Sequence, residues 1–129
     1  MVIVPRVVGL VLCDHFNVDL VERQMSLVGF FHTRRVESFP SPRHQFTVCA
    51  ALCDGIGEGT MRLEINRLET GSVIYFFERW FAAPPDRLLI INMEIRVRRC
   101  VFPTAGRYGV KLLFDGEPAA ERPLVVEPK

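Results

Sequence analysis

The stretch from Val101 to Val126 places the strongest constraint on the fold of this chain. From Tyr108 to Phe114, every second residue is apolar (Tyr108, Val110, Leu112 and Phe114), and a period of two is typical of a strand with one buried face. Asp115-Gly116 follows directly, and this dipeptide is a strong signal for a tight hairpin turn. A last strand around Leu124–Val126 is expected to pair back in the same sheet.

Six further segments have apolar residues at period two or in short runs, with turn residues between them. They are Val2–Asp14, Met25–Glu37, Gln45–Cys53, Met61–Leu68, Val73–Phe81 and Arg87–Arg99. The polar segment His15–Gln24 is expected to be a loop. About eight strands without a convincing helix are typical of an all-β fold. The uneven strand lengths favour a two-sheet antiparallel β-sandwich, with a barrel-like variant as the alternative.

The size and charge of the chain limit the kinds of partner that it can have. Its 129 residues fit one domain, spanning 1–129. Sixteen basic and fifteen acidic residues nearly cancel, so no overall field attracts nucleic acid or an anionic membrane. No apolar run approaches the ~20 residues that cross a bilayer as a helix. These features predict neither a nucleic-acid nor a membrane partner.

Four residues near the N-terminus, Leu10-Val11-Leu12-Cys13, resemble a lipoprotein cleavage box. We reject this interpretation because Arg6 interrupts the short apolar run and no basic segment leads it. A bulky leucine at position 12 also replaces the small residue that cleavage requires. We therefore expect a cytoplasmic protein, and the four cysteines are then expected to be free thiols.

Several short motifs resemble those of a known group of sequences. They are Cys13-Asp14, Ser26–Phe31, Phe39-Pro40, Arg99–Pro103, Gly106–Tyr108 and Asp115-Gly116. Together they resemble a family of uncharacterised bacterial proteins, one of the domain-of-unknown-function families. The resemblance covers nearly the whole chain. It implies a single-domain β protein and brings no catalytic residues and no cofactor.

The segment Val73–Phe81 carries apolar residues on both of its predicted faces, with Ile74, Phe76 and Trp80 on one of them. A strand in a two-layer domain buries only one face, so the surplus face must meet a loop, a helix or a partner. Two interpretations remain open: core beneath a long loop, or a protein–protein surface, most simply that of a homodimer. Aromatic side chains are favoured at the centre of such interfaces.

A cationic patch is the second candidate surface. Arg96 and Arg98 are expected on one outer face, and Arg34 would join them if its strand lay beside theirs. Such a patch would bind an anionic partner. The alternative is an ordinary solvated sheet face, since glutamates are interleaved with the arginines.

The spacing of the reactive side chains argues against a metal or a nucleophilic site. Cys49 and Cys53 on one strand would lie ~13 Å apart, too far for a shared metal or a disulfide. Cys13, Asp14 and His15 are consecutive, and neighbours on a strand point to opposite faces. We therefore expect no metal and no cofactor.

Three functions follow from these observations. The leading hypothesis is a non-enzymatic protein-interaction module that self-associates. The alternative is a β-sandwich that binds a small ligand or carbohydrate through a cleft or an aromatic face. The third is an enzyme with a loop-borne site, for which Asp14, His15, Asp54 and Asp86 are the available side chains.

Overall fold

The computed structural model describes residues 2–129, and these residues form ten strands and no helix. The strands are β1 (Arg6–Cys13), β2 (His15–Asp19), β3 (Gln24–Val28), β4 (Thr33–Val36), β5 (His44–Cys53), β6 (Glu58–Arg67), β7 (Val73–Ala82), β8 (Ile91–Cys100), β9 (Gly106–Phe114) and β10 (Glu117–Pro128). The all-β prediction is confirmed, with ten strands in place of about eight. Nothing in residues 2–129 is a helix long and apolar enough to cross a membrane.

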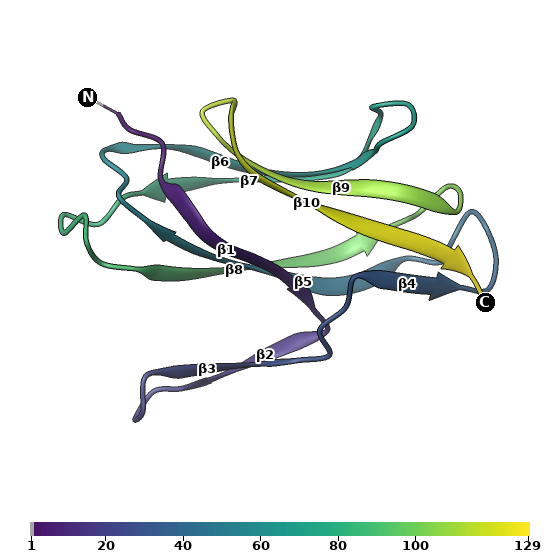
Figure 1. Ribbon diagram of the computed structural model, residues 1–129, viewed down its shortest axis with the longest axis horizontal. Coiled ribbons are helices and arrows are strands. Elements are labelled where there is room, and N and C mark those ends of the chain that lie inside the picture. The colour runs from purple at the N-terminus through teal and green to yellow at the C-terminus, as the bar shows by residue number, and fades with distance from the viewer. Residues whose placement is uncertain (1) are drawn as a thin grey trace.

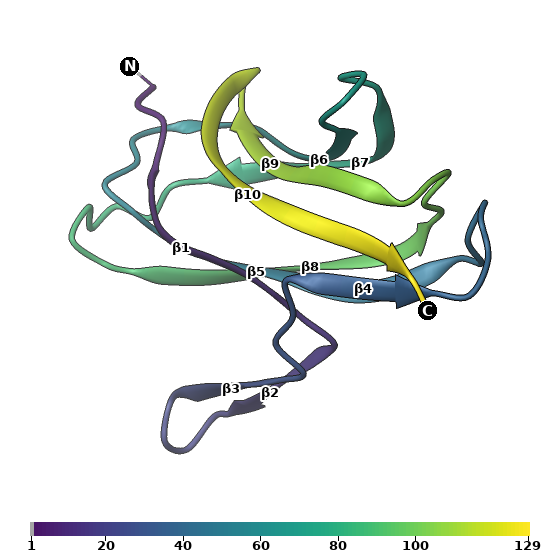
Figure 2. The ribbon, with the colours of Figure 1, turned by 45° about the vertical axis from the view of Figure 1, so that its right-hand side comes forward.

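The strands form three sheets (Figure 1). One has three strands in the order β1-β5-β8, and one has five in the order β4-β10-β9-β6-β7. The third is the hairpin β2–β3. Figures 1 and 2 show the five-stranded sheet curving over one side of the three-stranded sheet, while the hairpin lies on the other side.

The topology departs from the purely antiparallel arrangement that the sequence predicts. β4 runs parallel to β10, with Thr33 opposite Val125 and Val36 opposite Pro128. β10 is also longer than expected, since it begins at Glu117 and pairs with β9 almost from the turn onward. This length lets β10 contact β9 and, further along, β4.

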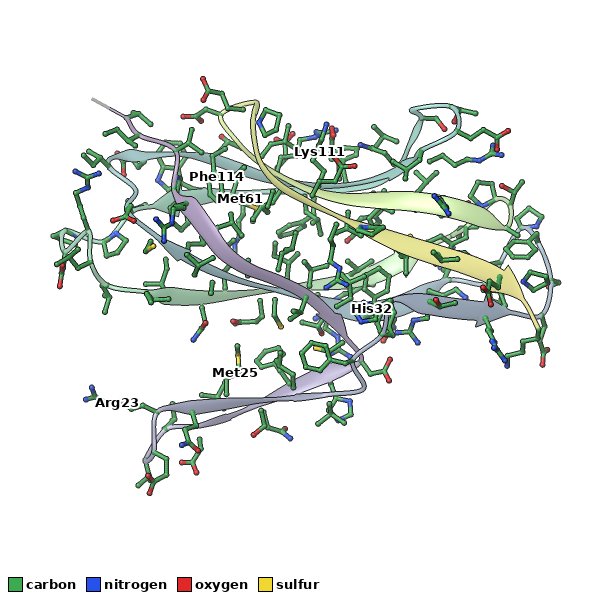
Figure 3. The ribbon with its side chains drawn as sticks, in the orientation of Figure 1. Arg23, Met25, His32, Met61, Lys111 and Phe114 are labelled. Carbon is green, nitrogen blue, oxygen red and sulfur yellow. The ribbon has the colours of Figure 1, made fainter. Side chains whose placement is uncertain are left out.

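One cluster of buried side chains joins the two larger sheets. The inward residues predicted for β5 are confirmed, since Phe46, Val48, Ala50 and Leu52 are all buried there. β6 shows the same pattern, and its Met61 pairs in register with Phe114 of β9, as labelled in Figure 3. Burial of these apolar faces is the main favourable contribution to folding, at roughly 25 cal/mol per Å².

The turn predicted at Asp115-Gly116 is confirmed. Both residues have positive φ, 49° and 80°, as a two-residue hairpin turn with the right twist requires. The Asp115 carboxylate also accepts a hydrogen bond from the backbone N–H of Thr60, at 2.8 Å. This contact ties the β9–β10 turn to the neighbouring strand β6.

The prediction of a loop over His15–Gln24 is wrong, because part of this segment forms the strand β2 and pairs with β3. The strand predicted over Met25–Glu37 is in turn divided between two sheets. The break falls at Gly29, which has a φ of +75°. A Cβ at this position would collide with the Asp14 carboxylate, so the chain turns here as only glycine allows.

The strand predicted over Arg87–Arg99 begins later, at Ile91. Its alternation is confirmed at Met93, Ile95 and Val97, which are buried. Leu89, predicted to point inward, is 50% exposed. The reason is a local turn, in which the Asp86 carboxylate accepts a hydrogen bond from the N–H of Leu88 at 3.0 Å.

Candidate functional site

The most exposed aromatic side chains of the chain lie on β7. This strand ends the five-stranded sheet, and within residues 2–129 no strand pairs with its other side. Trp80 is 64% exposed and Phe76 is 58% exposed. We call the outward side of β7, carrying Phe76, Glu78 and Trp80, the β7 face.

The register between β6 and β7 explains which side chains point outward. Buried Leu63 lies opposite Phe77, so Phe77 points toward the core side, although its edge position leaves it 36% exposed. Trp80 lies opposite Thr60 instead, on the outer side of the sheet. Because successive side chains of a strand alternate, the outer residues of β7 form one continuous row.

Ile74 does not share the exposure of the β7 face. The register shifts at this point, so that Val73 lies opposite Asn66 and Tyr75 lies opposite Ile65. Ile74 is therefore the extra residue of a bulge, and its side chain packs against the buried cluster. Of the three residues predicted to share this face, the structure places Phe76 and Trp80 on it.

Arg62 of β6 organises the polar part of the β7 face. It donates a hydrogen bond to Glu78 at 2.6 Å and lies 3.3 Å from a carboxylate oxygen of Glu64. Its guanidinium carbon lies 4.3 Å from the centre of the Phe76 ring, a cation–π distance. The hydrogen bond to Glu78 raises the pKa of Arg62 above its ordinary value, so this cation stays charged.

The opposite side of β7 holds the strand to the body. Phe81 contacts Phe114 edge to face, with ring centres 5.2 Å apart. Tyr75 packs against the buried cluster, and burial raises the pKa of its hydroxyl. β7 is thus a fixed strand that exposes aromatic side chains, because its inner residues contribute to the core.

The outer face of β5 is covered, in contrast to the β7 face. It was predicted to expose small residues, but Thr47 is fully buried and Cys49 is 4% exposed. The cover is the hairpin β2–β3, whose Met25 points toward this sheet in Figure 3. A groove of about 450 Å³, lined by Met25, Arg23 and Glu94 among others, remains beneath the outer part of the hairpin.

The three arginines of the predicted patch come from two sheets. Arg96 and Arg98 are exposed on β8. Arg34 lies on β4, where it pairs with Asp14 at 2.7 Å and stacks on Phe31 at 3.8 Å. Its guanidinium is thus engaged in internal contacts, and Arg96 and Arg98 are the members of the patch that face solvent.

The loop carboxylates proposed for an enzyme have local partners. Asp14 binds Arg34, and Asp86 accepts the N–H of Leu88. Asp54 accepts a hydrogen bond from the Cys53 thiol at 3.3 Å. Residues 2–129 contain no group of three or more side chains suited to hold a metal ion.

Sequence reasoning missed a close pair of thiols. Cys13 and Cys49 lie on adjacent strands with their sulfur atoms 3.9 Å apart, both as free cysteines. Burial, together with the neighbouring Cys13 thiol, raises the pKa of Cys49 to about 12. The sequence alone could not have predicted this thiol pair, because the two cysteines come together only through the pairing of β1 with β5.

Comparison with known proteins identifies the family and leaves the chemistry open. No curated protein matches this chain. The model of the family of unknown function DUF6941 matches residues 9–127, and it therefore covers every strand except the first part of β1 and the last residue of β10. This confirms the resemblance to a family of uncharacterised proteins, and the chain belongs to DUF6941.

Proposed function

We propose that this protein is a non-enzymatic interaction module that self-associates through the β7 face. The observation that carries the proposal is the exposure of Trp80 and Phe76 on a strand that ends its sheet. Tryptophan is among the residues that contribute most to binding when a partner covers them. An exposed edge strand is also an open template for pairing with another chain.

The surroundings of the two aromatic side chains support an interface. Interfaces combine an apolar centre with a polar rim. Trp80 and Phe76 would form the centre, while Arg62, Glu64 and Glu78 would supply charged groups at the rim. In the free protein Arg62 pairs with Glu64 and Glu78, so the β7 face carries hydrated charged groups beside its aromatic side chains.

The test is the solution mass of the protein by light scattering across a range of concentrations, for the wild type and Trp80→Ser. We expect a wild-type dimer that Trp80→Ser shifts toward monomer. Val21→Ser is the matched control, because Val21 is 88% exposed at the hairpin tip, away from β7. A wild-type monomer at every concentration would contradict the proposal.

The rest of the chain serves in this proposal as a scaffold. The sandwich-like packing of the two larger sheets holds β7 rigid, and the cytoplasm remains the expected compartment. Arg96 and Arg98 stay available for an anionic partner of the assembled protein.

A small ligand is the second candidate, and the groove beneath the hairpin favours it. Its volume of about 450 Å³ falls within the range of known ligand sites, whereas the apolar cavity beside Phe81 and Phe114 holds about 200 Å³. A thermal-shift screen that includes mono- and disaccharides tests this function. A stabilising compound whose effect Met25→Ala removes would place its site in the groove.

A further inference from the structure

We propose that the partner of β7 is β7 of a second copy, paired antiparallel about a two-fold axis at Phe77. The inference rests on the proposed self-association and specifies its geometry. The two five-stranded sheets would then continue into one sheet across the dimer. Backbone hydrogen bonds would satisfy the edge of β7, and outer side chains of the two copies, Phe76 and Glu78 among them, would contact each other across the new pair.

The strand has the properties that edge pairing requires. From Tyr75 to Ala82 it pairs with β6 without a register shift, so this part of its edge is regular. Natural edge strands avoid pairing through charged side chains, lysine above all, and through proline, bulges or short length. β7 has ten residues, contains neither proline nor lysine, and confines its bulge to Ile74 near one end. Its two charged residues are Glu78, which pairs with Arg62, and Arg79.

Strand length and charge together select the centre of the pairing. A symmetric continuation of the sheet pairs outer residues with outer residues, so the axis must pass through a residue position. Centring on Glu78 would place two carboxylates directly opposite each other, and centring on Arg79 would oppose two guanidinium groups. Like charges in direct opposition are destabilising. Phe77 avoids both, and an axis there lets Val73–Phe81 pair, a longer stretch of the strand than an axis at Phe76, Tyr75 or Trp80 allows.

The pairs that result from this centre are complementary. Phe77 meets Phe77, and Tyr75 meets Arg79 of the second copy, where a cation–π contact can form. On the outer side, Phe76 meets Glu78 of the second copy. Trp80 reaches the bulge at Ile74, whose side chain packs against the core, so the outer pairs of side chains end there. No pair in this register opposes two like charges.

Arg62 adds an argument for the same register. It already lies over the Phe76 ring and binds its own Glu78. With the second copy in place, the Glu78 carboxylate opposite Phe76 would approach this guanidinium from the other side. Each Arg62, which already contacts Glu64 and its own Glu78, would thus gain a third carboxylate, and the two-fold axis would repeat the arrangement.

The first test exchanges charge at the axis. Phe77→Lys alone and Phe77→Asp alone each place like charges opposite one another, and we expect each to weaken the dimer more than tenfold. An equimolar mixture should restore a heterodimer, measured by native mass spectrometry. The same pair of changes at Leu88, which is 85% exposed in the following loop, is the control and should alter nothing. A mixture that stays monomeric while each variant is folded by circular dichroism would overturn the Phe77 register.

The second test does not depend on the tolerance of the fold for a charge at residue 77. In a Cys53→Ser background, Phe77→Cys should form an intermolecular disulfide with oxidised glutathione, which is reduced as the two thiols are oxidised. Directly opposite residues have Cβ atoms ~4.5–5.5 Å apart, which is close to what a disulfide needs. Crosslinking at Glu78→Cys or Arg79→Cys instead would overturn the register and keep self-association. Monomeric wild type with no crosslink at any site would overturn both.

Discussion

The outer face of β5 and the β7 face are two outward sheet surfaces with different fates. Cys49 on β5 is 4% exposed, whereas Trp80 on β7 is 64% exposed. The hairpin β2–β3 covers the first, and no described segment covers the second. The comparison teaches that a surplus apolar face is not by itself an interface. It becomes a candidate only after the chain's own segments have been placed.

The largest expected effect comes from placing a charge on each surface. Cys49→Asp would bury a carboxylate beneath the hairpin, and we expect it to lower the free energy of unfolding by about 3 kcal/mol or more. Trp80→Asp places the same charge in solvent, and we expect a loss below about 1 kcal/mol. Urea denaturation at low protein concentration measures both. Equal losses would show that the two faces are equally covered.

A smaller effect tests how the hairpin is attached. Gly29 and Gly71 have nearly the same φ, +75° and +74°, but a Cβ on Gly29 meets Asp14 and one on Gly71 meets open space. Gly71→Ala should cost about 1 kcal/mol from the backbone alone. Gly29→Ala should cost more, because the junction must also shift. If the two variants denature at the same urea concentration, the contact with Asp14 does not fix the hairpin.

The beginning of β5, where His44 contacts Phe102, should also respond to pH. Burial first, and then the positive charge of Arg34, lower the pKa of His44 below its ordinary value of 6.5. The unfolded chain therefore takes up this proton first as the pH falls. Stability from His44 is complete above 6.5 and is lost as the pH falls toward the folded pKa. His44→Gln should show a smaller drop in urea midpoint between pH 7.5 and 5 than the wild type, and an identical drop would contradict this role.

The smallest effect is a difference in rate. Burial raises the pKa of Cys100 to about 12. The pKa of Cys49 is also raised to about 12, by burial first and then by the neighbouring Cys13 thiol. The two thiols therefore differ chiefly in which segment covers them. Opening of the hairpin should expose Cys49 and leave Cys100 buried. We expect faster labelling of Cys49 by a thiol reagent, followed by mass spectrometry, and a further increase in Gly29→Ala. Equal rates would mean that both thiols react only after global unfolding.

The sequence predicted which side chains of the long strands point inward, because a strand with one buried face has an apolar residue at every second position. Most residues predicted to point inward from β5, β6, β8 and β9 are buried in the structure, although Thr47 and Cys49 of β5 and Leu113 of β9 are buried as well. The hairpin β2–β3 was missed because its turn lacks an Asn-Gly or Asp-Gly pair. Asp19 takes that role, since its carboxylate accepts the N–H groups of Val21 and Glu22 at 3.0 and 3.1 Å. This capping aspartate was the available signal.

The candidate site could be predicted only in part. The surplus of aromatic side chains on β7 was readable, and Phe76 and Trp80 are exposed as an interface would need. Ile74 turned inward because a bulge depends on the pairing with β6, which is a long-range property. The separation of Arg34 from Arg96 and Arg98 is long-range as well, since it follows from which sheet β4 joins.

The position of β10 between β4 and β9 has a consequence for synthesis of the protein. β4 is complete at Val36, but its one neighbour in the sheet among residues 2–129 begins at Glu117. While a ribosome makes the intervening residues, β4 has no strand to join. The five-stranded sheet therefore closes late, after β10 has emerged, and until then the backbone groups of β4 that pair with β10 have no partner strand.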